Sequence, residues 1–204
     1  PGLPAGLTTF TGGKVDTESF AVFADFSYDL TDQLSLSVGG RWTQDKKSVD
    51  QLRQNYLGIK SPFFGNNAAI PAGRPSTDYT NSDTYSEFTP RISASYKFTP
   101  ELTGYASYGR GFKSGGFDMR GDAILTPNTV NGYNPETVDS YEAGLKGRVG
   151  PLSFASAIFY NEYQDQQVPT QVPAGAGIAS FVDNVGSSTF YGFEFEGQLR
   201  ILDS

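Results

Sequence analysis

Long runs of alternating apolar and polar residues constrain the fold of this chain more than any other feature. Seven runs have 12 or more residues each, whereas strands of soluble proteins usually have five or six. Side chains of a strand point alternately to opposite faces of a sheet, so this period predicts strands with two different faces. The sequence therefore predicts an all-β fold, an antiparallel up-and-down meander of about seven long strands. We place these strands at about 18–29, 33–47, 84–98, 102–113, 137–149, 152–168 and 184–201.

The connections between these strands alternate between short and long. Tight turns are expected at 30–32, 99–101 and 150–151, where the sequence reads LTD, TPE and GP. Residues 1–17 are expected to be a loop or the remnant of a strand. A meander with this alternation has its short turns at one end and its long loops at the other, as transmembrane barrels of the bacterial outer membrane do. The predicted extracellular loops are 48–83, 114–136 and 169–183.

The two faces of the five clearest strands differ in charge. One face presents residues such as Phe26, Leu36 and Ile92, and none of its 26 positions is charged. Because Lys or Arg at the middle of a bilayer costs about 2–4 kcal/mol, an uncharged face is what lipid requires. We therefore expect a lipid face and a wet face that lines the lumen. The predicted lumen-facing residues include Arg41, Glu87, Arg91, Glu142, Lys146, Glu194 and Glu196.

Two questions about the sheet stay open at this point. The strands at 102–113 and 152–168 carry aromatic residues at both alternate positions, so their lipid-facing side is not assigned. The inner face of a soluble β-sandwich would also lack charge, which makes a sandwich the alternative fold. Such a sandwich would interlock Phe26, Leu36 and Ile92 with Phe193 in a closed interior.

The composition excludes several classes of function. The chain has no Cys and no His, so thiol nucleophiles, cysteine metal clusters and the commonest general base are missing. An outer-membrane hydrolase would need an unusual base, and we predict no catalytic residue, no metal site and no cofactor. The net charge is -7 at pH 7, whereas a nucleic-acid surface needs a basic face. Nucleic acid is therefore not an expected partner.

The stretch YGRGFKSGGFDMR at 108–120 is similar in composition to a phosphate-binding loop but lacks its order. In that loop the Lys follows the last Gly and a helix begins, whereas here Lys113 precedes the glycine pair and no helical pattern follows. We interpret the stretch as a strand that leaves the sheet at the barrel rim. Arg110 and Lys113 would then lie near the extracellular mouth, close to an anionic ligand, lipopolysaccharide phosphates or neighbouring carboxylates.

Aromatic residues of the long loops are candidates for contact with a flat ligand such as a metal chelate. A ring buries a large area and has few rotatable bonds to immobilise. These rings could equally pack one loop against another. The predicted ligand-binding residues are Arg110, Lys113, Phe117, Arg120, Tyr79, Tyr85 and Tyr133.

Five segments resemble, in order and spacing, the barrel of TonB-dependent outer-membrane receptors. The resemblance covers most of the chain from about residue 18 and weakens in the long loops. The segments are FTPRISASYKFTPELTGYASY (88–108), YASYGRGFKSGGF (105–117), YNPETVDSYEAGLKG (133–147), AIFYNEYQDQQV (157–168) and NVGSSTFYGFEFEGQL (184–199).

The resemblance implies a 22-stranded barrel around an N-terminal plug that the TonB complex pulls on. Seven strands cannot close such a barrel, so we expect the chain to be an internal piece of a longer receptor. The expected location is the Gram-negative outer membrane, in contact with its lipid and lipopolysaccharide. The implied function is energised uptake of a large scarce solute, most often a ferric siderophore; a corrinoid, haem or a saccharide stays open. The alternative is a passive, porin-like or adhesive barrel.

Overall fold

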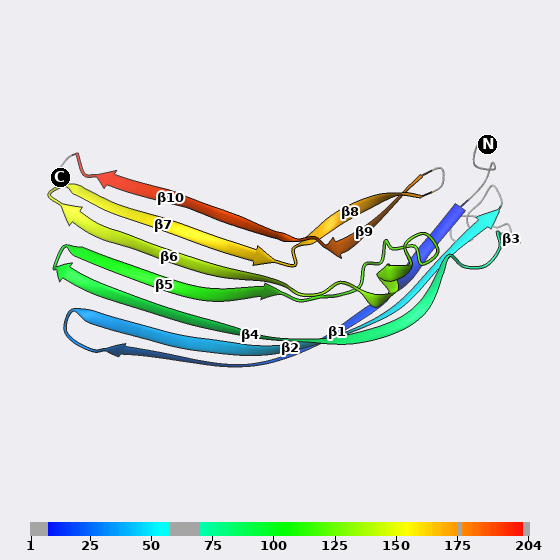
Figure 1. Ribbon diagram of the computed structural model, residues 1–204, viewed down its shortest axis with the longest axis horizontal. Helices are drawn as coiled ribbons and strands as arrows, with labels where there is room; N and C mark the ends of the chain where they lie inside the picture. Colours follow the sequence, from blue (N-terminus) through cyan, green and yellow to red (C-terminus); the bar gives the residue numbers. More distant parts are fainter. Residues whose placement is uncertain (1–7, 58–69, 175–176, 202–204) are drawn as a thin grey trace.

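One curved antiparallel sheet contains most of the strand residues in the described part of the protein. The computed structural model describes residues 8–57, 70–174 and 177–201. Seven long strands are hydrogen-bonded in the order β1-β2-β4-β5-β6-β7-β10, β3 pairs with β2, and β8 and β9 form a separate hairpin (Figure 1). The elements are β1 (Thr8–Asp29), β2 (Leu34–Leu57), β3 (Ile70–Pro71), β4 (Thr77–Thr99), β5 (Leu102–Lys113), the 3₁₀ helix η1 (Pro127–Asn131), β6 (Glu136–Val149), β7 (Leu152–Gln164), β8 (Gln167–Ala174), β9 (Gly177–Asn184) and β10 (Ser187–Leu199).

The sheet is the predicted meander. Each long strand pairs antiparallel with its neighbours. The tight turns β1–β2, β4–β5 and β6–β7 lie together at one end, and the longer connections lie at the other (Figure 1). The β6–β7 turn contains Gly150 at a φ of 58°, a conformation that glycine adopts without steric cost. Within the described residues, no helix has the length and apolar character needed to cross a membrane.

Several strand boundaries differ from the prediction. β1 begins at Thr8 instead of 18, β2 continues to Leu57 and β4 begins at Thr77, so both ends of the predicted loop 48–83 are strand. Residues 58–69 of that loop, and 1–7, lie outside the described part. The backbone ladder continues here because it does not depend on side-chain polarity. The alternation is lost because both faces are polar beyond the apolar band.

The second group of differences concerns the segment after β7. The predicted strand 152–168 is interrupted at Asp165, whose φ is 52° and therefore breaks the extended conformation. The chain then forms the β8–β9 hairpin inside the predicted loop 169–183. A turn with Gly186 at a φ of 57° separates β9 from β10, which begins at Ser187 instead of 184. η1 lies inside the predicted loop 114–136.

The strand register places the apolar positions of neighbouring strands opposite one another. A single row crosses the whole sheet on one face and consists of Phe26, Val38, Ile92, Tyr108, Tyr141, Tyr160 and Tyr191. This row shows which side of β5 and of β7 belongs to the apolar face, a question that the sequence left open. β5 turns Ala106 and Tyr108 to the apolar face, and β7 turns Ile158 and Tyr160 to it.

The apolar face is exposed and not packed into a core. Phe26 is 74% exposed, Phe193 67% and Ile92 48%. A soluble monomer rarely exposes so large a continuous apolar surface. The apolar run spans nine residues in β1, β2, β6, β7 and β10, which matches the nine to eleven residues that a tilted transmembrane strand needs. The sandwich alternative is therefore wrong, and this face requires an apolar surrounding.

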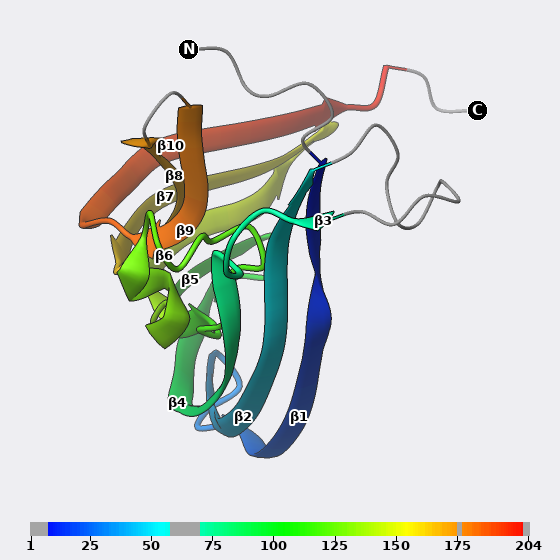
Figure 2. The same ribbon diagram turned by 90° about the vertical axis from the view of Figure 1, so that its right-hand side faces the viewer.

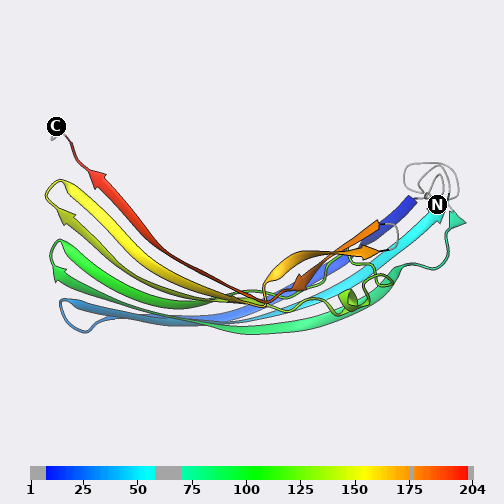
Figure 3. The ribbon, with the colours of Figure 1, turned by 45° about the horizontal axis from the view of Figure 1, so that its top comes forward.

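The polar face lies on the inside of the bend of the sheet. The segment 114–135 and the β8–β9 hairpin lie in the hollow of the bend (Figure 3). Figure 2 shows η1, β8 and β9 together at the end of the sheet opposite the tight turns. The few buried apolar side chains are here: among the described residues they are Val49, Tyr85, Phe117 and Ala179.

We predict that Gly144 is required where the Tyr105 ring crosses β6. A Cβ at Gly144 would lie 2.7 Å from that ring and would also clash with the Ser156 carbonyl. Gly144→Ala should therefore destabilise the protein by about 1–3 kcal/mol in denaturant unfolding in detergent micelles. Gly109→Ala is the matched control, because a Cβ there meets no atom within 4 Å. Equal unfolding midpoints for the two variants would contradict the packing of this face.

We also predict that β7 tolerates Lys on one face only. Ile158 lies on the apolar face and Ala157 lies opposite Glu194 on the polar face. Ile158→Lys should cost about 2–4 kcal/mol if the apolar face meets hydrocarbon, whereas Ala157→Lys places an ammonium near a carboxylate. The measurement is the folded fraction after insertion into lipid bilayers. Similar losses for both variants would refute the assignment of faces.

Candidate ligand-binding mouth and polar wall

Residues 114–135, the β8–β9 hairpin and the ends of β2 and β4 pack together at the long-loop end, and we call this group the mouth cluster. Residues 114–135 leave β5 through Gly115 and Gly116. The backbones of Gly116 and Tyr133 exchange hydrogen bonds of 3.0 and 2.8 Å. A Cβ at Gly115 would clash with the Tyr133 carbonyl and lie 2.5 Å from the Tyr85 ring. The glycine pair therefore permits the close approach that returns the chain onto the sheet.

Polar side chains of β2 and β4 hold the backbone of this segment. Gln51 is only 1% exposed; its Nε2 donates to the carbonyls of Met119 at 2.9 Å and Gly121 at 3.2 Å. The Tyr79 hydroxyl donates to Gln51 Oε1 at 3.2 Å. The buried Thr77 hydroxyl accepts from the Ala123 N–H at 3.0 Å. Buried backbone groups of an irregular segment are satisfied in this way by the strand wall.

Asp118 connects residues 114–135 to the β8–β9 hairpin. Its Oδ2 accepts from Arg120 Nη2 at 2.8 Å and from the Val182 N–H at 2.7 Å. Burial raises the pKa of Asp118, but the hydrogen bonds from Arg120 and Val182 outweigh burial and lower the pKa overall. The same contact raises the pKa of Arg120. The carboxylate is therefore ionised at neutral pH and holds the two segments together.

Two amide side chains support the base of the hairpin. Gln167 Nε2 donates to the carbonyls of Ser114 and Asn134, each at 3.0 Å. Asn184 Nδ2 donates to the Asn134 carbonyl at 3.0 Å, and Asn184 Oδ1 accepts from the Asn134 N–H at 2.7 Å. The hairpin and residues 114–135 thus share several polar contacts. None of these residues was predicted from the sequence, because contacts between an amide and a distant carbonyl leave no local pattern.

The aromatic candidates of the sequence gather in the mouth cluster. Phe117 is 7% exposed and Tyr85 6%, so both rings pack the cluster internally. Burial, with a contribution from the nearby Asp83 charge, raises the pKa of Tyr85 from 10.0 to about 12. Burial raises the pKa of Tyr79 and of Tyr133, and the negative charge of Asp118 raises both further. The mouth cluster contains five of the seven predicted ligand-binding residues, and their role in binding stays a prediction: Tyr79, Tyr85, Phe117, Arg120 and Tyr133.

Arg110 and Lys113 lie outside this cluster. Arg110 is opposite Asp139 in the register, on the same side as the apolar row and one strand period beyond it. Its Nη2 lies 3.7 Å from Asp139 Oδ2, and the Tyr108 hydroxyl donates to Asp139 Oδ1 at 2.7 Å. The sequence left three partners open for Arg110, namely an anionic ligand, lipopolysaccharide phosphates and a neighbouring carboxylate. The structure contains the carboxylate, which belongs to Asp139. Lys113 is the exposed last residue of β5.

The predicted lumen-facing residues lie on the polar face, which we call the polar wall. Arg91 Nε donates to Asp25 Oδ1 at 2.7 Å, across Gly39 of the strand between them. Arg41 Nε donates to Thr43 Oγ1 at 3.0 Å. An exposed ion pair such as that of Arg91 and Asp25 contributes about 0–1 kcal/mol, so it lines the wall without fixing the fold.

On the polar wall, Glu142 of β6 and Glu194 and Glu196 of β10 form no ion pair with the described residues. Glu142 accepts from the Tyr105 hydroxyl at 2.6 Å, and Lys146 Nζ lies 5.0 Å from the centre of the Tyr105 ring. Within the described ranges, Glu87, Glu194 and Glu196 have no ion-pair or hydrogen-bond partner. The wall thus offers unpaired charge of both signs, because Arg41 and Lys146 also lack an ion-pair partner among the described residues. The described part of the chain also holds no cluster of acidic side chains suited to a metal ion.

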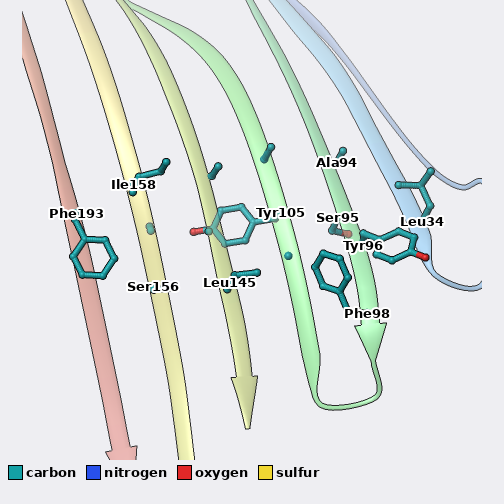
Figure 4. Close-up of a pocket in the computed structure, with 15 residues that line it drawn as sticks. Leu34, Ala94, Ser95, Tyr96, Phe98, Tyr105, Leu145, Ser156, Ile158 and Phe193 are labelled. Carbon is teal, nitrogen blue, oxygen red and sulfur yellow. The ribbon is translucent and has the colours of Figure 1, made fainter. Parts of the chain in front are cut away.

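A separate hollow of about 520 Å³ lies on the apolar face (Figure 4). Small residues such as Gly104, Ala106 and Ala143 form its floor, and Phe98, Tyr96, Leu145, Ile158 and Phe193 border it. No charged side chain lines it. A hollow of this composition suits hydrocarbon and not a polar solute, so the mouth cluster is the better candidate for ligand binding.

We predict that removing the Asp118 carboxylate loosens the hairpin without unfolding the sheet. Asp118→Ala should speed exchange of the Val182 amide at least about tenfold, since charge-assisted hydrogen bonds contribute about 1.5–3 kcal/mol. Asp165→Asn is the control, because the Asp165 carboxylate forms no hydrogen bond or ion pair with the described residues and Asn tolerates its positive φ. Hydrogen exchange of β10 should stay unchanged in both variants.

The wild-type contact should also depend on pH. The pKa of Asp118 is lowered in the folded chain. The ionised carboxylate therefore stabilises the hairpin contact fully above the ordinary aspartate pKa of 3.8, and this stabilisation is lost as the pH falls through the lowered pKa. Val182 exchange, corrected for its intrinsic pH dependence, should rise in this acid range only. Protection that persists in Asp118→Ala would contradict the role of the carboxylate.

Comparison with known proteins agrees with this architecture. The chain matches the family model described as "TonB dependent receptor-like, beta-barrel" over residues 1–203. It is 26% identical over 188 residues to the pesticin receptor of Yersinia enterocolitica, covering 92% of the chain and 24% of that receptor. It is 28% identical over 183 residues to the metal-pseudopaline receptor CntO of Pseudomonas aeruginosa, covering 86% of the chain and 23% of that receptor.

A solved structure shows the same fold. The crystal structure of the ferric yersiniabactin uptake receptor FyuA from Yersinia pestis superposes with a TM-score of 0.72 at 20% identity, over 95% of the chain and 26% of that receptor. The chain thus spans about a quarter of the length of its relatives. The chain belongs to the TonB-dependent receptors of the Gram-negative outer membrane and forms part of their β-barrel.

Proposed function

We propose that this chain is a section of a receptor that takes up a scarce metal chelate, most specifically a ferric siderophore, with energy from the TonB complex. The observation that carries the proposal is the inward fold of residues 114–135. They lie on the polar face at the long-loop end, held by the buried Gln51 and Thr77. A segment fixed in this way narrows the opening and presents polar and aromatic groups to a solute. The relatives named for a metal-pseudopaline and for ferric yersiniabactin support the class of solute.

The polar wall has a different role in this proposal. Glu194 and Glu196 lie on the polar face and have no ion-pair partner in the described chain, so they are available to a plug that would fill the barrel. We propose that such a plug carries complementary cations and that the TonB complex pulls on it after the solute binds. Hydrated ion pairs are individually weak, which suits a contact that must break and form again during transport.

The apolar face would contact outer-membrane lipid. Its row ends in Tyr108, Tyr141, Tyr160 and Tyr191, on adjacent strands, and aromatic rings of this kind gather at membrane interfaces. Arg110 lies one strand period beyond this row, next to Asp139. We propose that this level meets the lipopolysaccharide headgroups, with Arg110 only partly neutralised by its carboxylate.

Uptake by cells tests the function. Deletion of the complete receptor gene should abolish high-affinity uptake of one radiolabelled ferric chelate among a trihydroxamate, a tricatecholate and a hydroxycarboxylate. Deletion of TonB should abolish the same uptake. Unchanged uptake of every chelate would remove the proposal, and uptake that survives loss of TonB would favour a passive barrel.

A further inference from the structure

A second hollow lies inside the mouth cluster, between η1 and the β8–β9 hairpin. Its volume is about 340 Å³, within the range of 300–1,000 Å³ that is usual for small-molecule sites. Leu125 and Thr129 line one side, and Val172, Phe181 and Asp183 line the other. η1 and β9 are neighbours in Figure 2. The hollow thus joins two segments that are more than 40 residues apart in the chain.

Hydrogen bonds fix both sides of this hollow. On the side of η1, the buried Thr129 hydroxyl donates to the Thr126 carbonyl at 2.8 Å, and the Thr126 hydroxyl donates to the Asp122 carbonyl at 2.9 Å. On the hairpin side, the Val182 N–H donates to Asp118 at 2.7 Å, between the two lining residues Phe181 and Asp183. A hollow whose sides are already held loses little entropy when a ligand group enters.

The charge around the hollow is negative. Segments 114–135 and 165–186 contain four aspartates and one arginine. That arginine, Arg120, is paired with Asp118 at 2.8 Å, and Asp122 lies 3.6 Å from Arg53. The charge of Asp183 is therefore not balanced from these segments, and Asp183 is the one charged residue among those that line the hollow in the described chain. A concave site with one sign of charge attracts the opposite sign.

We propose that this hollow binds a protonated aliphatic amine, such as the amine-bearing arm of a solute. The alkyl part would lie against Val172 and Phe181, and the ammonium would face the Asp183 carboxylate. An anionic arm would meet uncompensated negative charge and is disfavoured. This inference rests on the proposed function, because it assigns part of the transported solute to the mouth cluster.

Binding of two small probes to the complete receptor in detergent micelles tests the inference. n-Pentylammonium and 1-pentanol have the same alkyl chain and differ in charge, and ligand-observed NMR measures both dissociation constants. The wild type should bind the ammonium about threefold or more tightly than the alcohol, a ratio that a partly exposed ion pair supplies. Higher salt should reduce the ratio, because the attraction is screened.

Two variants separate the contributions of charge and apolar contact. Asp183→Asn should bring the ratio close to one and leave alcohol binding unchanged, and Phe181→Ala should weaken both probes. Asp165→Asn removes a carboxylate from the turn that precedes this hairpin and does not line the hollow, so it should keep the wild-type ratio. A wild type that binds neither probe, or a ratio that Asp183→Asn leaves intact, would overturn the inference.

The probe experiment and the uptake experiment test separate hypotheses, so either result can contradict one hypothesis and leave the other standing. Loss of TonB-dependent uptake on gene deletion, together with no preference for the ammonium, would leave the proposed function standing and remove the amine site. Ammonium binding that depends on Asp183, in a receptor whose deletion changes no uptake, would establish the site and remove the proposed function.

Discussion

The structure depends on the backbone hydrogen-bond ladder, which pairs every long strand with its neighbours while one face of the sheet is apolar. A sheet can meet hydrocarbon only if its N–H and C=O groups find partners inside the sheet, since lipid offers none. The register satisfies this requirement between neighbouring strands, leaving the outer edges of β1 and β10 without a partner strand in the described sheet. It also aligns the apolar positions, so that Phe26 of β1 and Tyr191 of β10 end one continuous row. A one-residue slip would turn a whole strand over and place charges in that row.

The same ladder explains why the strands are longer than the apolar band. Beyond the band, water can solvate both faces, so side-chain polarity no longer selects a face, yet the backbone pairs of β1, β2 and β4 continue. These extensions give residues 114–135 a wall to pack on. Gln51 and Thr77 are almost fully buried there although both are polar, because they satisfy backbone groups of a segment that has little regular structure of its own.

The sequence predicted the meander and the tight turns. It also predicted the apolar face of the five strands in which one set of alternate positions carries no charge. It could not assign β5 or β7. Tyr105 and Tyr108 have opposite parities, and only the pairing of Tyr108 with Ile92 and Tyr141 shows which of them faces the apolar side. Arg110 carried a similar ambiguity, since its side of the strand follows from the same register. The contacts of Gln51, Gln167 and Asn184 were missed because each joins an amide to carbonyls that are distant in sequence.

Carboxylates on the inner side of the sheet fall into two groups with different consequences. In the mouth cluster, Asp118 accepts hydrogen bonds from Arg120 and from a backbone N–H. These bonds compensate its charge, lower its pKa and hold the hairpin in place. On the polar wall, Glu194 and Glu196 have no such partners in the described chain. A charge that is already compensated fixes the position of its neighbours, whereas an exposed, hydrated charge stays available to a partner. The rigid end of the sheet is thus suited to selecting a solute, and the open wall to a partner that moves.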